Sequence, residues 1–550
     1  MAAVEKELKS LQDSLSEKVK KANANDSGIP ESRRTTLGDR SYKGTGATPK
    51  HIRKTTSFLE DDEPSFALTE NKQTSLKPKQ NVKNDLYIDD VSGKSLSAIK
   101  IFSLSIKYLK DHCLTTMRER GIEPGGTEIK YVLTVPAIWN DRSKQFMRTA
   151  AVEAGIGNDH IVLALEPEAA SVYCQQVPLE NLKIGIGKVI SVPGTRYLVA
   201  DIGGGTADFS VHEVDEDGSL TELYRASGGP YGGIYVDKKY LEIYDIICGQ
   251  KALEKLKIND IEEYLTLLRE FERKKRSITP EFQTFFVTRL SLILNKMCSE
   301  EDKLKAIESS YLKDQVKIKN DKLKISASLM KSFFEDSLNQ IIQHVWEILR
   351  NIPNLENILI VGGYGECSLL QERFKKEFLD KNIVIPNDCS LAIIKGAVLF
   401  GQNPRVVSAR ILRYSYGAAI QPIFNPKKHP DERRYIDKNG IERCKEAFDQ
   451  LIARDTKVPS TGKTVTSTGV PVSKSQKKYN LRIYCTEQKN ATVIDESFQL
   501  LGKLKISAPD YIEGKWEAEE HYTFGMTEIN VSATVKGTGE YIETTFDLLE

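Results

Sequence analysis

One short glycine-rich stretch between two aspartates has the residue types to bind a phosphate and a cation together. In VADIGGGTADFSV (199–211), an apolar run ends at Asp201, and Gly203, Gly204 and Gly205 then lead to Thr206 and Asp208. Glycine lacks a Cβ and adopts positive φ, so successive backbone N–H groups can converge on an anion. An aspartate that ends a buried strand needs a cation or bound water, and a magnesium–phosphate group explains both features. A tight hairpin turn with solvated aspartates is the alternative interpretation.

The composition is that of an ordinary globular protein and favours no charged partner. The 550 residues are 40% hydrophobic and 28% charged, with a formal net charge of +1, so we expect neither nucleic acid nor a membrane as a partner. The eight cysteines lie far apart without metal-binding spacing, which is typical of reduced thiols. No apolar run approaches the roughly 18 residues of a membrane span, and the N-terminus lacks a signal-peptide core. We expect a cytoplasmic or nuclear protein of several domains.

The residue pattern changes near position 86. Residues 1–85 are rich in Ser, Thr, Lys, Arg and Gly, with helically spaced apolar residues only near the start. This composition predicts a flexible tail with one short helix. Beyond it, a helical pattern at 94–121, a buried-strand pattern at 130–139 and a second helical pattern at 140–156 follow one another. The alternation recurs up to about residue 402, which predicts an α/β region.

A different pattern begins near residue 409. Segments such as NLRIYCTE (480–487) and TEINVSATV (527–535) alternate or are rich in β-branched residues, with turn residues between them. The Asn-Gly pair in DKNG (437–440) is a strong signal for a tight hairpin turn. These features predict a separate all-β domain over 409–550.

Several motifs, in a fixed order, resemble one superfamily. YLVADIGGGTADFSV (197–211) is similar to the second phosphate motif of the actin, sugar-kinase and 70-kDa heat shock superfamily. Three other segments resemble, in the heat shock family's own order, its first connecting segment, its adenosine-contacting helix and its adenosine loop: YVLTVPAIWNDRSKQFMRTAAVEAGI (131–156), FERKKRSIT (271–279) and ILIVGGYGECSLLQERF (358–374). The variants LEPEAAS (165–171), GGPYGG (228–233) and KGAVLFG (395–401) resemble the family's divergent 12A/12B-like branch.

The resemblance covers about residues 90–550 and implies a fold, ligands and partners. It implies an α/β, actin-like two-lobed ATPase of the ribonuclease H-like fold over 86–404, followed by an all-β, substrate-binding β-sandwich over 409–550. The nucleotide-binding part would comprise an incomplete first lobe (86–194) and a second lobe (195–404), with subdomain IIB at about 237–329. The expected ligands are ATP or ADP with Mg²⁺, and the expected partners are peptide or protein clients.

The family's roles transfer to matching positions of this sequence. Three residues would be catalytic: Asp201, Thr206 and Glu166. Asp201 and Asp208 would lie near the Mg²⁺ and its waters, and Pro136 matches the switch proline. Ten residues would bind the nucleotide: Gly203, Gly204, Gly205, Thr206, Lys275, Arg276, Thr279, Gly362, Gly363 and Tyr364. On local pattern alone, Lys275 and Arg276 are more typical of a charged helix face, and only their place between two glycine motifs favours contact with a nucleotide.

The sequence departs from the family at the first phosphate loop. The family has an N-terminal hairpin of the form apolar-Asp-apolar-Gly-Thr-Thr, and residues 1–90 contain no such segment. The phosphate-facing lysine has no secure counterpart, although Lys72 and Lys77 lie in the relevant stretch. Glu366 also replaces an arginine that ordinary members place against adenine. Phosphoryl transfer depends on positioning and charge stabilisation, so we expect weak or absent ATP hydrolysis.

Three functions are compatible with this pattern. The first is a chaperone-like 70-kDa heat shock protein, in which nucleotide is coupled to a β-domain that binds peptide or partner protein. The second is a nucleotide-independent scaffold, or pseudo-ATPase, on the same fold. The third is a small-molecule kinase, because fold does not fix function. The β-domain after the adenosine motif argues against the kinase.

Overall fold

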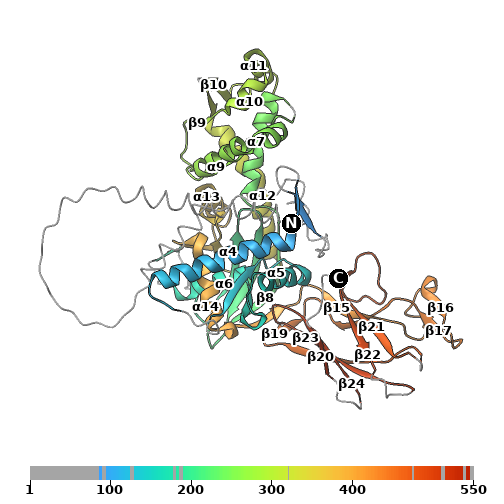
Figure 1. Ribbon diagram of the computed structural model, residues 1–550. Coiled ribbons are helices and arrows are strands. Elements are labelled where there is room, and N and C mark those ends of the chain that lie inside the picture. Colours follow the sequence, from blue (N-terminus) through green and yellow to red (C-terminus); the bar gives the residue numbers. More distant parts are fainter. Residues whose placement is uncertain are drawn as a thin grey trace, which may run out of the picture. The chain divides into compact units, whose positions relative to one another are not determined.

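The computed structural model describes residues 86–89, 94–123, 129–177, 181–184, 190–249, 251–319, 321–352, 354–473, 476–508, 514–536 and 541–544. The predicted tail and its short helix lie outside these residues. Figure 1 shows the arrangement of the helices and strands. None of the helices in the described ranges is both long enough and apolar enough to span a bilayer.

The described helices lie between Ala98 and Gln402. They are α4 (Ala98–Glu119), α5 (Asp141–Glu153), α6 (Glu166–Gln176), α7 (Ile234–Cys248), α8 (Ala252–Asn259), α9 (Ile261–Lys275), α10 (Leu292–Met297), α11 (Glu300–Glu308), α12 (Ala327–Asn351), α13 (Ser368–Glu377) and α14 (Ala392–Gln402).

The described strands begin at Tyr87 and continue to Thr544. They are β1 (Tyr87–Asp89), β2 (Ser95–Ser97), β3 (Tyr131–Val135), β4 (Ile161–Leu165), β5 (Leu182–Ile184), β6 (Arg196–Ile202), β7 (Ala207–Val214), β8 (Leu220–Gly229), β9 (Phe286–Arg289), β10 (Val316–Lys319), β11 (Lys322–Ile325), β12 (Asn357–Val361), β13 (Asn382–Pro386), β14 (Val407–Ile411), β15 (Ser415–Ile420), β16 (Arg434–Ile436), β17 (Glu442–Cys444), β18 (Ala447–Ile452), β19 (Lys457–Pro459), β20 (Lys463–Gly469), β21 (Lys478–Thr486), β22 (Gln499–Ser507), β23 (Ala518–Phe524), β24 (Asn530–Val535) and β25 (Tyr541–Thr544).

A mixed sheet of eight strands carries the glycine-rich stretch. Its order is β19-β14-β8-β7-β6-β12-β13-β5. β6 and β7 are antiparallel neighbours, and β12 runs parallel to β6 on the other side. Successive side chains of a strand point to opposite faces, so Leu198 and Ala200 of β6 enter one buried cluster while Tyr197 and Val199 enter another. Burial on both faces explains why β6 is a nearly continuous apolar run.

A smaller group of elements precedes this sheet in the chain. β3 and β4 form a parallel two-stranded sheet in register from Tyr131↔Ile161 to Val135↔Leu165. The helix between them, α5, begins after Asn140, whose side chain accepts a hydrogen bond from Ser143 N at 2.9 Å and satisfies a free N–H of the first turn. The helix predicted at 94–121 begins later, at Ala98, because residues 95–97 form β2 and pair with β1.

The segment between β8 and β12 is mostly helical. Helices α8, α10 and α11 pack against α7, and the three-stranded sheet β10-β11-β9 belongs to the same segment (Figure 1). Ser326 caps the following helix, α12, by accepting from Leu329 N. The apolar face of α12 then packs into the cluster that contains α7 and β6.

The C-terminal region is strand-rich, as predicted. The four-stranded sheets β18-β15-β21-β22 and β20-β23-β24-β25 share one buried cluster, which is the arrangement of a β-sandwich. The predicted turn at 437–440 joins β16 to β17, with Gly440 at φ +78° and its N–H bonded to Asp437 O at 3.0 Å. The predicted domain start at residue 409 falls inside β14, which belongs to the eight-stranded sheet.

Candidate functional site

Three carboxylates converge where β6, β7 and α6 meet. Asp201 near the end of β6 pairs directly with Asp208 near the start of β7, and Glu166 begins α6. One carboxylate oxygen from each lies within 4.8 Å of the other two. Asp201 is only 4% exposed and Asp208 only 1%. The structure therefore brings together three of the residues predicted to act at a metal site.

Burial dominates the electrostatics of this carboxylate cluster. It raises the pKa of Asp208 to about 7 and, together with the charge of Asp208, that of Asp201 to about 8. Burial and both aspartates also raise the pKa of Glu166 well above its usual range. Asp208 Oδ2 accepts a hydrogen bond from Thr206 Oγ1 at 3.1 Å, whereas the buried Oδ1 has no partner within the described part of the chain. These oxygens fit a divalent cation such as Mg²⁺, which would supply the missing positive charge.

The glycine loop between the two aspartates is a hairpin turn whose amides are available. Gly203 N donates to Thr206 O at 2.9 Å and closes the turn. Among the described residues, the N–H groups of Gly204 and Gly205 have no hydrogen-bond partner, and no atom lies within 4 Å of an added Cβ at either position. The prediction of a tight hairpin turn is therefore correct for the backbone. The prediction that its two aspartates are solvated is wrong, because both are buried.

The start of α7 holds this loop from the other side. Gly233 N and Ile234 N donate to the carbonyls of Gly203 and Gly204 at 3.2 and 2.8 Å. A Cβ on Gly232 would lie 2.3 Å from Gly204 O, so this close approach requires glycine. Sequence reasoning treated GGPYGG (228–233) only as a marker of a branch. The signal that could have revealed the contact with the glycine loop was a pair of glycines, Gly232 and Gly233, immediately before a helical pattern.

The residues predicted to contact adenosine lie at the end of α9. Lys275 Nζ donates to Asp237 Oδ1 at 2.6 Å and also forms an ion pair with Glu272. The side chain of Arg276 is 57% exposed and donates to Glu272 Oε1 at 3.1 Å. Thr279 follows in the next turn, where its carbonyl accepts from Phe282 N. Asp237 lies in the first turn of α7, so α7 connects this end of α9 to the glycine loop.

The second glycine loop lies at the same edge of the sheet as Asp201. Val361, the last residue of β12, is in register with Asp201, and Gly362 follows it at φ +88°. Gly363 is open, with no atom within 4 Å of an added Cβ. The ring of Tyr364 is buried and stacks against Phe334, with 6.4 Å between centroids. The backbone of Gly362 and Gly363 is therefore near the carboxylates, whereas the side chain of Tyr364 packs in the core.

Two further predicted positions have defined surroundings, and two do not. Glu366 Oε1 accepts from Ser390 Oγ at 2.6 Å. Pro136 begins a turn that Trp139 N closes by donating to Pro136 O at 3.1 Å. Lys72 and Lys77 lie outside the described residues.

Sequence reasoning missed a cation that comes from the C-terminal region. Arg413, two residues after β14, donates to Ile138 O, and the backbone of Ile138 itself lowers the pKa of Asp208. The positive charge of Arg413 lowers the pKa of Asp208 against the larger effect of burial. No local pattern around Arg413 could reveal this contact, because its partner lies 275 positions away.

Comparison with known proteins gives one result throughout. The family model described as "Hsp70 protein" matches residues 62–404, more than half of the chain. Heat shock 70 kDa protein 12A of Mus musculus and of Homo sapiens are each 29% identical to the chain over 561 residues, which cover 90% of this chain and 82% of the relative. Heat shock 70 kDa protein 12B of Homo sapiens is 28% identical over 532 residues, covering 84% and 77%.

The match and the geometry agree on the fold. The matched range contains the carboxylate cluster, both glycine loops and α9. The mixed α/β part is therefore the actin-like ATPase domain that was expected, and a strand-rich region follows it. This chain is a divergent member of the Hsp70 protein family.

Proposed function

We propose that this protein binds ATP or ADP with Mg²⁺ at the edge of the sheet formed by β6, β7 and β12. The observation that carries the proposal is the cluster of Glu166, Asp201 and Asp208 beside a glycine loop with two amides that have no hydrogen-bond partner among the described residues. Two buried aspartates beside a partly buried glutamate are costly without a cation, and such clusters with raised pKa values are typical of functional sites. Family membership supports the same assignment.

Each residue has a defined task in this proposal. Mg²⁺ neutralises phosphate charge, and Asp201 and Asp208 hold it or its waters, with Glu166 beside them. The N–H groups of Gly204 and Gly205 and the hydroxyl of Thr206 face the phosphates. The Arg276 guanidinium, which is planar, exposed and weakly hydrated, stacks on the purine.

We propose that hydrolysis is weak or lost. Residues 1–90 contain no segment like the family's first phosphate loop, so one of the two sets of donors to the phosphate is missing from this sequence. Each 1.4 kcal/mol of lost transition-state stabilisation lowers the rate about tenfold. Binding tolerates this loss better than catalysis, because catalysis depends on interactions made in the transition state.

We further propose that the C-terminal β-sandwich binds peptides or a partner protein, in a chaperone-like role coupled to nucleotide. The segment between β15 and β18 exposes apolar side chains: Ile423 and Ile436 are each 68% exposed. Ile436 lies in β16, and Ile423 forms an isolated bridge to Arg443 of β17, the strand that pairs with β16. Exposed apolar side chains beside a short pair of strands suit an extended apolar peptide.

Calorimetry with Mg²⁺ and ATP on the full chain tests the nucleotide site. We expect micromolar affinity that is lost in Asp201→Asn and retained in Asp217→Asn, a control at an exposed turn. The absence of heat at millimolar ATP would refute the site and favour a nucleotide-independent scaffold. Phosphate release as fast as that of ordinary family members would refute weak hydrolysis.

A peptide-array measurement tests the β-sandwich. The full chain should retain apolar peptides, and Mg²⁺ with ATP should change their affinity. Substituting both Ile423 and Ile436 by Ser should reduce retention, whereas Ile258→Ser, at an isoleucine 76% exposed in α8, should not. Equal retention by both variants would contradict the assignment.

A further inference from the structure

The segment that joins the ATPase domain to the β-sandwich is an interior strand of the eight-stranded sheet. β14 pairs with β8 at Val407↔Leu220 and with β19 at Ile411↔Lys457. β8 belongs to the ATPase domain and β19 to the C-terminal region. One continuous sheet therefore includes strands from both, and its main-chain hydrogen bonds hold the linker on two sides.

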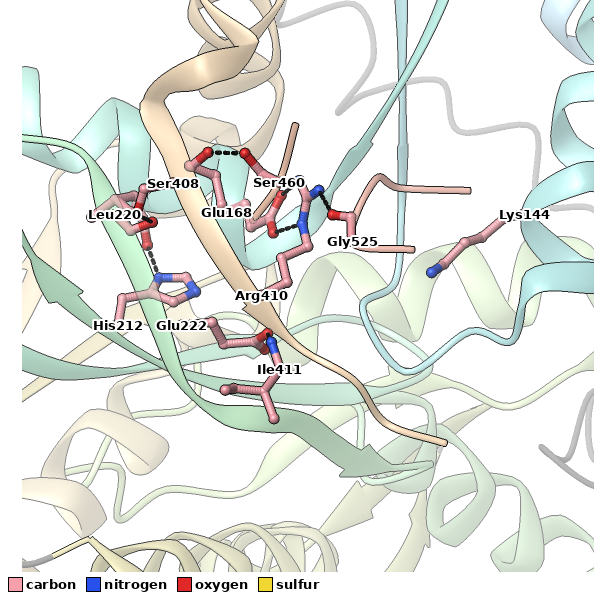
Figure 2. A network of polar contacts seen from close by, with 12 residues as sticks. Lys144, Glu168, His212, Leu220, Glu222, Ser408, Arg410, Ile411, Ser460 and Gly525 are labelled. Atoms are coloured by element: carbon pink, nitrogen blue, oxygen red, sulfur yellow. Dashed lines mark hydrogen bonds and ion pairs between the residues drawn. The ribbon is translucent and has the colours of Figure 1, made fainter. Parts of the chain in front are cut away.

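The side chain of a buried arginine in β14 also holds this strand in place. Arg410 is only 8% exposed, and Glu168, its partner on α6, is 3% exposed. Arg410 Nε and Nη2 donate to the two carboxylate oxygens of Glu168 at 2.6 and 2.8 Å, and Nη1 donates to Gly525 O at 2.7 Å. Figure 2 shows the guanidinium between the carboxylate and this carbonyl. One side chain thus connects the linker, the ATPase domain and the β-sandwich.

The residues around the contact between Arg410 and Gly525 are closely packed, so it has little room to shift. Gly525 has φ +100°, and an added Cβ there would lie 2.3 Å from Pro459 O of β19. On the other side of β14, Glu222 Oε2 accepts from Ile411 N at 2.7 Å (Figure 2). Bidentate arginine–carboxylate pairs are both strong and directional.

Other contacts between the two regions are also made by the chain itself. Arg148 of α5 forms a bidentate pair with Glu528, with Nε–Oε1 and Nη2–Oε2 distances of 2.8 and 2.6 Å. Tyr416 OH donates to the buried Asp141 at 3.1 Å. These polar groups are paired with one another, so their hydrogen bonds do not require a nucleotide.

We propose that Arg410 is a positioning residue that keeps the linker strand in the sheet, and the β-sandwich on the ATPase domain, whether or not nucleotide is bound. The buried pair with Glu168 acts as a lock: with either partner removed, the docked state contains an uncompensated buried charge. Nucleotide then changes the β-sandwich through the docked contacts rather than by releasing the linker. The lock itself does not depend on nucleotide binding, whereas the route by which nucleotide acts rests on the proposed function.

Hydrogen exchange of the full chain, followed by mass spectrometry on the linker peptide 407–412, tests the lock. Without nucleotide, we expect its amides to exchange at least about 100-fold more slowly than in the unfolded chain, and Mg²⁺ with ATP to change this little. Arg410→Met and Glu168→Gln should each accelerate exchange at least about tenfold. Arg410→Lys keeps the positive charge but cannot donate to both carboxylate oxygens at once. Its linker amides should exchange at a rate between those of the wild type and of Arg410→Met.

Two controls separate the lock from general damage. Arg225→Met removes a half-exposed pair with Asp455, 2.9 Å apart, at the same junction, and should change linker exchange less than about twofold. In the double variant Glu168→Gln/Arg410→Met, the acceleration should be smaller than the product of the two single effects, because the partners are coupled. Exchange in α12 reports whether each variant is folded.

Two results would overturn the proposal. One is a linker that exchanges at the unfolded rate in the ligand-free protein and becomes protected only with Mg²⁺ and ATP. The other is equal acceleration by Arg410→Met and Arg225→Met in variants whose α12 remains protected. If ATP does not bind, exchange of the linker at the unfolded rate in the ligand-free protein would by itself overturn the proposal, and the comparison of Arg410→Met with Arg225→Met would be unaffected.

Discussion

Gly362 lies directly against Asp201 across two parallel strands. A Cβ on Gly362 would be 2.7 Å from Asp201 Oδ1 and 2.5 Å from Ile202 O, and the residue has φ +88°. The position therefore requires glycine for two independent reasons, backbone conformation and space. The second glycine loop therefore packs its backbone against the Asp201 carboxylate without contributing a side chain.

Gly362→Ala should therefore damage both stability and binding. We expect a loss of about 1–3 kcal/mol in the free energy of unfolding, from strain and from the displaced neighbours, and weaker Mg²⁺-dependent nucleotide binding. Gly363→Ala is the matched control, because its φ is −64° and no atom lies within 4 Å of an added Cβ. Chemical denaturation and calorimetry on both variants check this, and equal effects would contradict the geometry.

Asp208→Asn should stabilise the ligand-free protein while impairing its site. The carboxylate is 1% exposed and has one oxygen without a hydrogen-bond partner among the described residues, so a neutral amide removes the cost of burying charge. We expect a gain of about 0.5–2 kcal/mol, together with loss of the stabilisation that Mg²⁺ and nucleotide give to the wild type. Thermal melting with and without Mg²⁺ and ADP measures both. A destabilised apo variant would argue for a purely structural role.

Arg276→Ala should separate nucleotide contact from structure. The ion pair with Glu272 is exposed and contributes little to stability, so the melting temperature should not change. If the guanidinium stacks on adenine, ADP affinity should fall about 3–30-fold. Arg273→Ala, exposed on the same helix, should leave affinity unchanged. Equal ADP affinity in the two variants would indicate that Arg276 is only part of a charged, solvent-exposed helix face and does not contact the nucleotide.

The sequence predicted the local elements well because their causes are local. β6 is recognisable as an apolar run ending at Asp201, and the α5 helix follows from a capping asparagine and helical spacing. The grouping of Asp201 with Glu166 could be expected only through the resemblance to a family, because it depends on how separate elements pack. The structure then showed that both aspartates are buried.

The contacts that join the two regions could not be predicted in the same way. Arg410 and Arg413 lie in a stretch with no motif, and their partners Glu168 and Ile138 are more than 200 positions away. The boundary predicted at residue 409 falls within β14, and the place of this strand in the interior of the eight-stranded sheet could not be read from local pattern. Strand pairing between distant segments is decided by the whole sheet rather than by local propensity.

Glu222 should make the linker strand sensitive to high pH. Burial raises its pKa to about 8, aided by Glu168 and opposed by Arg410 and by hydrogen bonds from the backbone of Ile411 and Ala226. Its folded-state pKa exceeds the ordinary value of 4.5, so the folded protein retains a proton that the unfolded chain has lost. Stability is therefore greatest below about pH 4.5 for this group and falls by up to about 1.4 kcal/mol per pH unit as pH rises towards 8.

Glu222→Gln removes that titration but keeps an oxygen that can accept from Ile411 N. We expect the variant to gain stability relative to wild type between pH 5.5 and 8.5, with slower hydrogen exchange of linker residues 407–412 at the higher pH. Glu213→Gln changes a partly exposed glutamate of β7. The free energy of unfolding of this variant should depend on pH in the same way as that of the wild type. If the free energy of unfolding of Glu222→Gln also depends on pH as in the wild type, the Glu222 carboxyl is ionised in the folded protein at pH 5.5. The pH dependence of the linker would then have to come from another group.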